Sequence, residues 1–562
     1  MAQGVAEKAN HSWLPFRSLR AYRPGFLPGD LAAGLTLAAI AIPEQMATAR
    51  LGGFPPEIGF FAFITGSVGF AMFGANRFLS CGADSTITPI FAGGLAMLAA
   101  VGSPDYQALA IALALLVGVM LTLSGLFRLG GIANLLSVPV TVGFLAGIAV
   151  HILVSQLPGV LGLPSPSGST IERIGVLAGE LGHVNIFTLV IGLGVLAVVF
   201  ACEFVSAKIP GALIGLVAAT LAVIGAGLEA KGVRVVGAVP GTLPIPSLPD
   251  IAPERWARLV SLALTIAIVV MVQTAATTRA FPSDPDKPAD VDRDFLGAGA
   301  GSILAGLFGA FPVNASPPRT GIVAETGGHS QASGLFAATI VLALLAFGTG
   351  LLAHVPDAAL GGILLFVALR IIRLRQILTI YRQSKAEFLL VLATVAAIVA
   401  LPIQQGAGLG ITLSLLHGIW STTRARLVTF DRVPGTTIWW PAHPHVAGER
   451  VPGVAVVGMQ APLSFLNAPS FRADVLGVVK AAVPKPKLLV LEASGMVEID
   501  FTAAQVLHEL LGECRDEGVT VAMARLESTR AQAAFERFAL YDVLPRDHIF
   551  HSVEEAVRAL AK

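Results

Sequence analysis

The sequence predicts a polytopic α-helical membrane domain followed by a small soluble α/β domain. Of its 562 residues, 54% are hydrophobic and 13% are charged, and the mean hydropathy is +0.76. Soluble domains carry about 25% charged residues. The last 112 residues hold 25 charged side chains, whereas the first 450 hold 48. We therefore expect an amino-terminal segment at 1–29, a membrane domain at 30–424, a linker at 425–453 and a soluble domain at 454–562.

The membrane domain contains a series of apolar runs. Runs of about 17 to 25 residues can each cross a bilayer. Three shorter runs, near 86–101, 296–309 and 319–334, bring the total close to fourteen segments. The longer runs lie at about 31–49, 57–75, 108–127, 134–156, 185–204, 210–228, 259–277, 337–353, 357–372, 386–402 and 406–423.

Positive charges gather on one side of this predicted domain. An even number of segments places both termini on the same side, and Lys and Arg mark the cytoplasmic face. No small-residue cleavage site follows the amino-terminal cations, so we expect this end to be retained as an anchor. The cations on this face include Arg17, Arg20, Arg23, Arg128, Lys208, Arg370, Arg373, Arg375, Arg382, Lys385, Arg424 and Arg426.

A residue pattern occurs twice in the membrane domain. The first copy consists of Gly66-Ser67, Phe73-Gly74-Ala75 and Asp84. The second copy, 235 residues later, consists of Gly301-Ser302, Phe308-Gly309-Ala310 and Arg319. In both copies an irregular stretch, 78–83 or 311–318, leads into a short apolar segment. Interrupted segments at matching places in two halves are the best sequence pointer to a transporter's binding site.

The two short segments predict an anion site. A helix that begins in mid-membrane directs unpaired N–H groups and the positive end of its dipole toward the membrane centre. Irregular backbone at that depth must be enclosed by protein or line a cavity. Arg319 would add a full positive charge at the start of the second short helix. The alternative is that Arg319 lies at a helix end and reaches the membrane interface.

Two acids, Glu44 and Asp84, interrupt the apolar segments. Burying either charge is costly, so each should face a cavity, pair with a cation or take up a proton. One interpretation makes Glu44 or Asp84 a proton-coupling residue. The other is structural, because Asp84 could pair with Arg319 or cap its own helix. Gln273 roughly mirrors Glu44 in the second half, and its amide could hydrogen-bond an oxyanion or another helix.

The other polar features indicate no further chemistry. The Asp-rich stretch 283–294 is predicted to be a solvated cytoplasmic loop. Cys81, Cys202 and Cys514 lie far apart without metal-ligand spacing, so we expect no disulfide framework, metal or cofactor. A net charge of +1 provides no basic field for nucleic acid. The sequence contains no set of nucleophile and base, so we expect no enzymatic activity.

The soluble end alternates between strand-like and helical patterns. Strands are expected at 454–457, 487–492 and 519–523, with helices at about 502–517 and 552–560. This alternation predicts a small α/β sandwich. Thr502 stands at the start of a predicted helix, where its hydroxyl could serve as the N-cap.

Five stretches of the membrane domain form a recognisable combination: Pro43-Glu44-Gln45-Met46-Ala47, Gly53-Phe54-Pro55-Pro56-Glu57-Ile58-Gly59-Phe60, Phe73-Gly74-Ala75-Asn76-Arg77, Gly306-Leu307-Phe308-Gly309-Ala310-Phe311-Pro312 and Arg319-Thr320. Together they resemble the SulP family of sulfate permeases, bacterial relatives of pendrin and prestin. The soluble domain resembles the STAS domain of that family. The resemblance covers nearly the whole chain and implies fourteen segments in a seven-plus-seven inverted repeat with core and gate domains, alternating access and a homodimer.

The resemblance also implies a binding site. In the family the anion lies between the facing ends of the third and tenth helices and is contacted from the first and eighth. The matching positions here are Glu44, Ala83, Asp84, Ser85, Thr86, Gln273, Pro318, Arg319 and Thr320. Thr502 matches the place where free-standing STAS antagonists are phosphorylated, which makes it a candidate regulatory residue.

This sequence departs from the family pattern at four positions. Glu44 stands where many members have Gln, and Asp84 where they have small or aromatic residues, so the site is more negative than usual. Gln273 replaces an acid that some bicarbonate transporters use for sodium, which argues against sodium coupling. Pro318 stands where Ser or Gly is more usual, so one backbone N–H donor is missing.

The predicted function is secondary-active transport of a small anion, with sulfate and bicarbonate ahead of dicarboxylates. The expected partners are this anion, a co-transported proton, membrane lipid and a second copy of the chain, in a bacterial inner membrane. Two alternatives stay open. A nucleobase permease of the same fold usually carries acids in its eighth and tenth helices, where Gln273 and Arg319 stand. A membrane-tethered signalling scaffold would use only the soluble domain.

Overall fold

In the computed structural model the chain forms two compact units, Met1–Leu415 and Leu416–Lys562. The predicted cytoplasmic cations Lys208, Arg424 and Arg426 lie outside the described residues. The described residues are 15–561 with the exception of 21, 132–136, 165, 167–169, 207–208, 239–245, 247, 285, 287, 424–426 and 444–447.

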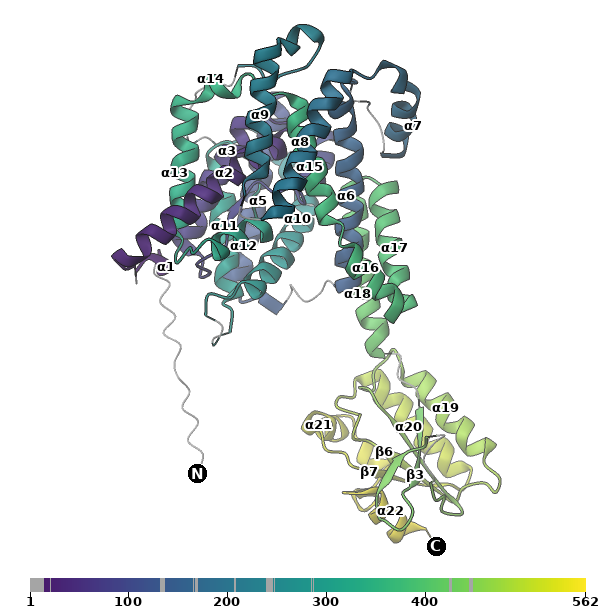
Figure 1. The fold of residues 1–562 in the computed structure, drawn as a ribbon. Helices are drawn as coiled ribbons and strands as arrows, with labels where there is room; N and C mark the ends of the chain where they lie inside the picture. Colours follow the sequence, from purple (N-terminus) through teal and green to yellow (C-terminus); the bar gives the residue numbers. More distant parts are fainter. Residues whose placement is uncertain are drawn as a thin grey trace. The chain divides into compact units, whose positions relative to one another are not determined.

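The first unit is helical (Figure 1), and fourteen of its described helices form two sets that follow one another along the chain. The first set is α2 (Leu27–Leu51), α3 (Pro56–Phe73), α4 (Thr88–Ala96), α5 (Pro104–Leu126), α6 (Val138–Leu161), α8 (Ile186–Val205) and α9 (Gly211–Ala226). The second set is α10 (Pro253–Ala280), α11 (Val291–Leu307), α12 (Pro317–Glu325), α13 (Ala332–Phe347), α15 (Asp357–Ile371), α17 (Lys385–Ala400) and α18 (Ile403–Thr423). In both sets the third helix is short and follows a two-residue strand, β1 (Cys81–Gly82) or β2 (Asn314–Ala315). This arrangement agrees with the predicted repeat.

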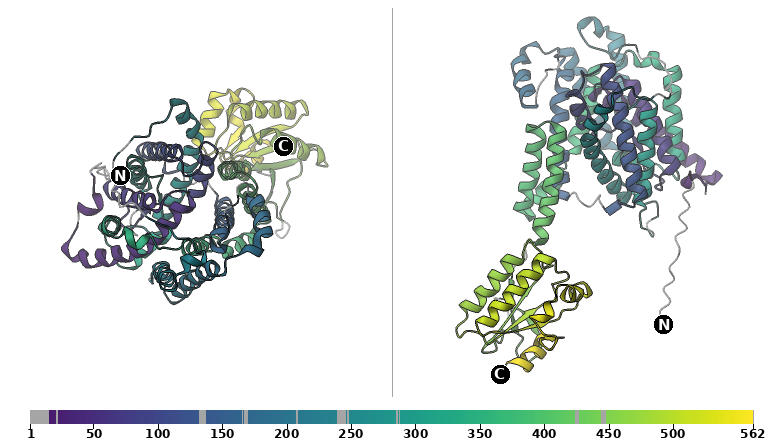
Figure 2. Two further views of the ribbon diagram at one scale, coloured as in Figure 1. Left: turned by 90° about the horizontal axis from the view of Figure 1, so that it is seen from above. Right: turned by 180° about the vertical axis from the view of Figure 1, so that it is seen from behind.

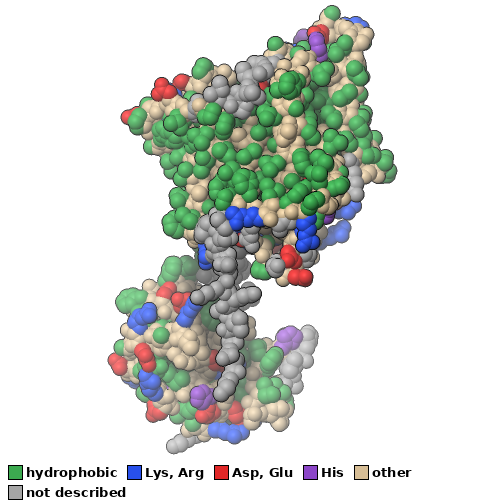
Figure 3. Space-filling model, turned by 90° about the vertical axis from the view of Figure 1, so that its left-hand side faces the viewer, with side chains coloured by type: hydrophobic (Ala, Val, Ile, Leu, Met, Phe, Trp, Pro, Cys, Tyr) green, Lys and Arg blue, Asp and Glu red, His purple; other side chains and the backbone are tan. Residues whose placement is uncertain are grey.

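The surface of the first unit is suited to lipid. Within the described residues, six helices are long and apolar enough to cross a membrane: α2, α3, α5, α6, α8 and α10. Figure 3 shows hydrophobic side chains covering one lateral face of this unit, with charged side chains toward its rims. Large apolar side chains such as Phe204 and Phe347 are 94% and 91% exposed. Exposing so much apolar surface to water would be unfavourable, so the unit is an integral membrane domain.

The helices of the first unit pack as two groups. The core group contains α2 to α5 and α10 to α13, and the gate group contains α6, α8, α9, α15 and α17. Within the core group, α3 and α11 carry the repeated Gly-Ser motif and pack closely against each other. A Cβ atom on Gly69 would lie 2.4 Å from the backbone nitrogen of Gly301. Only glycine permits this approach between the two halves.

The Asp-rich stretch 283–294 was expected to be a solvated loop, and this expectation is wrong at its end. Helix α11 begins within it, and Asp294 is fully buried. Its carboxylate accepts hydrogen bonds from the N–H groups of Ala75 and Asn76, both at 2.8 Å, and from the hydroxyl of Thr278 at 2.7 Å. A carboxylate can leave water only where other donors replace it. These donors come from distant parts of the chain, so the local pattern does not reveal them.

The second unit is a six-stranded sheet with helices on both faces (Figures 1 and 2). The strand order is β4-β3-β5-β6-β7-β8, and β5 (Val454–Met459), β6 (Leu488–Glu492), β7 (Thr520–Ala524) and β8 (Ile549–Phe550) run parallel. Successive side chains of a strand point to opposite faces. Leu489 and Leu491 therefore join a core with α19 (Ala468–Ala481), α20 (Phe501–Asp516) and α21 (Thr529–Arg537), whereas Leu488 and Val490 pack with α22 (Val553–Leu560). This is the α/β domain that the sequence predicts.

Two details of the second unit correct the sequence prediction. The range 425–453, predicted as a linker, supplies β3 (Leu427–Arg432), which pairs with β5, and β4 (Trp439–Pro441), which pairs with β3. Both strands lie toward one edge of the sheet and are only half-buried or exposed, so they lack a strong apolar alternation. The N-cap of α20 is Asp500, which accepts a 2.8 Å hydrogen bond from the N–H of Ala503. Thr502 is exposed in the first turn and is not the cap.

Candidate functional site

The starts of the two short helices, α4 and α12, meet through a small antiparallel sheet. Cys81 of β1 pairs with Ala315 of β2, and Gly82 pairs with Asn314. The two irregular stretches that precede these helices therefore lie side by side, although one comes from each half of the repeat. Both the repeat and the family resemblance predicted this meeting.

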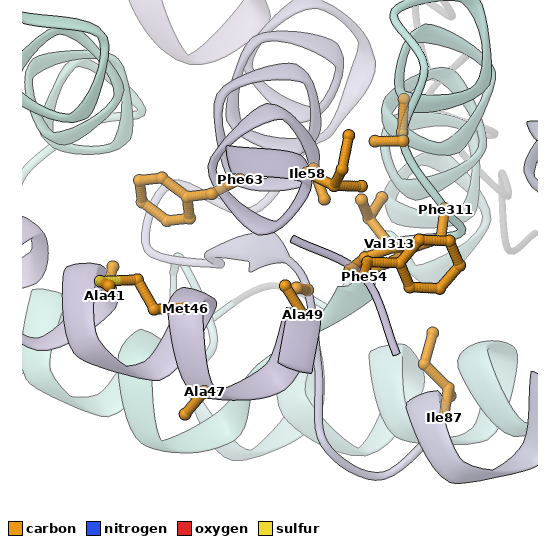
Figure 4. Packing of buried hydrophobic residues seen from close by; sticks show 14 of the residues in the cluster. Ala41, Met46, Ala47, Ala49, Phe54, Ile58, Phe63, Ile87, Phe311 and Val313 are labelled. Atoms are coloured by element: carbon orange, nitrogen blue, oxygen red, sulfur yellow. The ribbon is translucent and has the colours of Figure 1, made fainter. Parts of the chain in front are cut away.

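An aromatic cluster packs near this junction. The ring centres of Phe54 and Phe311 are 5.2 Å apart, and those of Phe91 and Phe311 are 5.1 Å apart. Figure 4 shows Phe54, Phe311 and Val313 close together, with Ile87 beside them. Because these side chains come from both halves of the chain, their packing holds the two helix starts together.

A cavity of about 450 Å³ lies between the core group and the gate group. Its core-group wall includes Glu44 of α2, residues 84–86, Gln273 of α10 and the start of α12. The gate-group wall consists of side chains from α6, α8, α9 and α15, among them Leu145, Val199, Ala212, Ile363, Phe366, Val367 and Arg370. Six of the predicted site residues line the cavity: Glu44, Asp84, Ser85, Thr86, Gln273 and Pro318. The other three, Ala83, Arg319 and Thr320, are buried behind its wall.

Arg319 is fully buried, which excludes the interfacial position considered above. Its Nη1 atom lies 3.4 Å from Oε1 of Glu44 and donates a 3.1 Å hydrogen bond to the carbonyl of Ala83. Its Nε and Nη2 atoms have no hydrogen-bond partner among the described residues. A buried guanidinium has five donors to satisfy. Arg319 therefore keeps unused donors beside the acid that separates it from the cavity, and its ion-pair partner is Glu44 rather than Asp84.

Asp84 belongs to a hydrogen-bonded set with Thr86, Gln273 and Asn314. Its Oδ1 atom accepts from the backbone N–H of Thr86 at 2.9 Å, from the hydroxyl of Thr86, and from Nδ2 of Asn314 at 3.2 Å. The same Nδ2 atom donates to Oε1 of Gln273 at 2.7 Å. The N-cap of α4 is Ile87, without a side-chain cap. Asp84 thus fastens the turn before α4, and Asn314 links this turn to α10 and β2.

Gln45 and Asn314 hydrogen-bond to residues of the site, and neither was predicted from the sequence as a site residue. The side chain of Gln45 accepts from the N–H of Ala83 at 2.8 Å and donates to its carbonyl at 3.1 Å, so it fixes the backbone that Arg319 also contacts. A signal existed for both residues. Gln45 directly follows Glu44 in a motif of the resemblance, and Asn314 lies within the irregular stretch 311–318 of the repeat.

The start of α4 presents free backbone donors. The N–H groups of Ser85 and Ile87 form no hydrogen bond with the described part of the chain, whereas that of Thr86 is taken by Asp84. Ser85 also lines the cavity. Unpaired N–H groups at a helix start can bind an oxyanion.

The start of α12 is poorer in donors. Pro317 and Pro318 have no N–H group, and the N–H of Ser316 donates to the carbonyl of Ser80 at 3.0 Å. Pro317 therefore removes a second donor, beyond the one that Pro318 was expected to remove. The hydroxyl of Thr320 accepts from the N–H of Ser80 at 3.1 Å and donates to the carbonyl of Ser316 at 2.7 Å. Thr320 thus holds the two starts together.

Known proteins are similar to this chain in sequence and in fold. The profile described as the Sulfate permease family matches residues 27–394, and that of the STAS domain matches residues 445–556. A probable sulfate transporter of Mycobacterium tuberculosis is 35% identical over 98% of this chain and 98% of its own length. The chain belongs to the sulfate permease family. Both parts of the resemblance drawn from the motifs are thereby confirmed.

More distant members of the sulfate permease family and solved structures are also similar to this chain. A putative sulfate transporter of Bacillus subtilis, YvdB, is 25% identical over 94% of this chain and 96% of its own length. The murine anion transporter Slc26a9 in its inward-facing state has a TM-score of 0.89 at 21% identity and covers 98% of this chain and 94% of that chain. The transmembrane domain of the cyanobacterial bicarbonate transporter BicA has a TM-score of 0.60 at 23% identity and covers 70% of this chain and 98% of that chain. The chain is thus a membrane transporter of this family with the predicted fold class.

Proposed function

We propose that this family member carries a small inorganic anion across the membrane by secondary-active, alternating-access transport, with sulfate as the first candidate. The observation that carries the proposal is the cavity at the joined starts of α4 and α12, bounded by both helix groups. The relatives from M. tuberculosis and B. subtilis are named as sulfate transporters. The fold of the bicarbonate transporter BicA supports bicarbonate as the second candidate.

In this proposal the anion binds in the cavity at the start of α4. The free N–H groups of Ser85 and Ile87 supply neutral donors, and the unused Nε and Nη2 donors of Arg319 supply positive charge. Charge-assisted hydrogen bonds to an oxyanion are roughly twice as strong as neutral ones. Arg319 can reach the anion only if Glu44 moves aside or loses its charge, because this acid is its partner in the structure.

We assign proton coupling to Glu44. A proton on Glu44 removes the counter-charge of Arg319, so a proton and an anion load together. One proton offsets the whole charge of bicarbonate and one of the two negative charges of sulfate. Asp84 was the other candidate. It already accepts hydrogen bonds from Thr86 and Asn314, and we therefore assign it the structural role. Gln273 offers no carboxylate to a cation, which supports transport without sodium.

Uptake of radiolabelled sulfate by proteoliposomes tests both parts of the proposal. We expect an inward proton gradient to accelerate uptake by the wild type. We expect Glu44→Gln to transport sulfate with a flattened pH dependence, because the protonated and substituted side chains are both neutral. Glu254→Gln, which changes an exposed acid in the first turn of α10, is the control and should keep the wild-type pH profile. If the wild-type protein transported neither sulfate nor bicarbonate, the proposed substrate would be wrong. If Glu44→Gln kept the wild-type pH profile, the proposed proton coupling would be wrong.

We further propose a homodimer in a bacterial inner membrane with both termini in the cytoplasm. Arg370 and Arg373 at the end of α15 support this orientation through the positive-inside rule. Thr502 is exposed on α20 and remains the candidate for phosphorylation. Mass spectrometry of the purified protein in detergent tests the dimer, and phosphopeptide mapping tests the modification.

A further inference from the structure

The cavity ends at a contact between one core-group helix and one gate-group helix. In α2 the cavity is lined by Ile40 and Glu44. Arg50 lies six residues beyond Glu44, about 9 Å farther along the helix at 1.5 Å per residue. In α15 the cavity is lined from Ile363 onward, whereas Asp357 is the first residue of the helix. The end of α2 and the start of α15 therefore lie beyond the same end of the cavity.

Arg50 and Asp357 meet at this end. Nη2 of Arg50 donates to Oδ2 of Asp357 at 2.7 Å, and the two side chains are 36% and 19% exposed. This ion pair joins the core group to the gate group. The pair of Arg255 with Asp105, at 2.9 Å, joins two core-group helices instead.

A second hollow lies on the other side of the ion pair. It has a volume of about 330 Å³ and is lined by Arg50, residues 53–57, Val236 and Ala238. Arg50 lines this hollow and does not line the cavity. Arg50 thus connects the ion pair to this second hollow, whereas α2 and α15 lead from the ion pair to the cavity.

Backbone contacts with residues 234 and 235 hold Asp357 in position. Its N–H donates to the carbonyl of Arg234 at 3.0 Å, and the preceding residue, Pro356, forms a β-bridge with Val235. Its Oδ1 atom has no hydrogen-bond partner within the described residues. Arg50 is the cation that contacts the carboxylate, and Arg234 is a second cation near it. Arg50 is in the last turn of α2, and Arg234 precedes the bridge residue Val235.

The face on which the ion pair lies follows from the direction of α15. This helix runs from Asp357 to Ile371, the cavity residue Arg370 is in its last turn, and Arg373 lies two residues beyond its end. Arg370 and Arg373 belong to the cations that mark the cytoplasmic side. The ion pair therefore lies toward the extracytoplasmic side, and the cavity extends toward the cytoplasm.

We propose that Arg50 and Asp357 form an extracytoplasmic gate that holds the transporter in the conformation open to the cytoplasm. For an anion to enter from outside, α2 and α15 must separate and the ion pair must break. Both charges then become hydrated in the widened hollow. Because the ion pair exists in one conformation and not in the other, its strength sets the balance between them. This proposal rests on the alternating access proposed above and identifies the residues that bias it.

Thiol labelling measures the opening of this gate without measuring transport. Leu145 lines the cavity from α6 and is half-buried, so Leu145→Cys, in a chain whose native cysteines are replaced by alanine, reports access to the cavity. A membrane-impermeant methanethiosulfonate reagent is added outside right-side-out vesicles. We expect Arg50→Ala and Asp357→Ala each to raise the labelling rate about fivefold, as the loss of a partly exposed ion pair allows. The charge swap Arg50→Asp with Asp357→Arg should restore the low rate.

Two further variants make the test specific. Arg255→Ala breaks an ion pair within the core group and should leave labelling unchanged. Arg50→Lys keeps the charge and should keep the rate low, which separates the loss of the ion pair from the loss of side-chain volume. Unchanged labelling in both Arg50→Ala and Asp357→Ala would overturn the gate. Faster labelling in these variants, together with wild-type protein that carries no sulfate, would support the gate and contradict only the proposed substrate.

Discussion

The starts of α4 and α12 hold matching places in the repeat, yet their chemistry differs. At the start of α4, Asp84 and Ser85 line the cavity, and the N–H of Ser85 forms no hydrogen bond with the described part of the chain. The start of α12 begins with two prolines and keeps the guanidinium of Arg319 behind the cavity wall. The repeat thus determines where the two starts meet, and the side chains of each half determine what they contribute. One half supplies neutral donors, and the other supplies charge.

The same contrast extends to matched residues that bind no ligand. Ser302 and Ser67 are equivalent in the repeat. The hydroxyl of Ser302 lies 3.3 Å from the N–H and 3.4 Å from the carbonyl of Val313. The hydroxyl of Ser67 is buried without a hydrogen-bond partner among the described residues. The two equivalent serines therefore contribute differently to the free energy of unfolding. The same substitution made at both positions tests this difference.

The largest effect is expected for Arg319→Ala. Removing one member of a buried ion pair costs about 3 to 5 kcal/mol of folding stability. Removing the cationic partner of a bound anion costs about 2 to 5 kcal/mol of binding free energy, which corresponds to about 30-fold or more in affinity. We expect sulfate uptake at low substrate to fall by at least this factor, and the melting temperature to fall because Glu44 is left unpaired. The double variant Glu44→Gln with Arg319→Ala should recover stability but not transport. If Arg319→Ala took up sulfate at the wild-type rate, the positive charge at the start of α12 would not be needed for transport.

A smaller effect is expected for Asn314→Ala, which removes the link between the two starts. Its amide donates to Asp84 and Gln273, and losing a hydrogen bond to a charged group costs about 1.5 to 3 kcal/mol. We expect the sulfate concentration at half-maximal uptake to rise about tenfold. Leu79 is the counterpart of Asn314 in the first half and is buried and apolar. Leu79→Ala is the control, and it should lower the melting temperature while changing the half-maximal concentration much less. Equal changes in affinity would mean that the two starts do not act as one site.

The smallest effect separates the matched serines. Ser302→Ala should lower the free energy of unfolding by about 1 kcal/mol, since a buried hydrogen bond is lost. Ser67→Ala should leave it unchanged or raise it, because a buried hydroxyl without a partner is removed. Thermal melting of both variants in the same detergent is the measurement. A larger loss of stability in Ser67→Ala than in Ser302→Ala would contradict this difference between the two serines.

The sequence predicts those features that depend on local pattern. The apolar runs, the repeat and the cationic face follow from residue spacing, and the repeat leads to the joined helix starts. The polar interruptions of the apolar runs single out Glu44, Asp84 and Gln273, whereas the cavity residues Ser85, Thr86 and Pro318 were named only through the family resemblance. Features that depend on distant partners are missed. Asp294 reads as part of a solvated loop because its donors at Ala75 and Asn76 are more than 200 residues away. The pairing of Arg319 with Glu44 rather than Asp84 likewise depends on how α2 packs against α12.

Anomalous X-ray scattering from crystals soaked in selenate, which has the shape and charge of sulfate, tests the central claim most directly. We predict an anomalous peak inside the cavity, within hydrogen-bond distance of the N–H of Ser85, with a longer separation between Arg319 and Glu44 than the present 3.4 Å. A selenate peak outside the cavity, or inside it but away from the starts of both α4 and α12, would contradict the account.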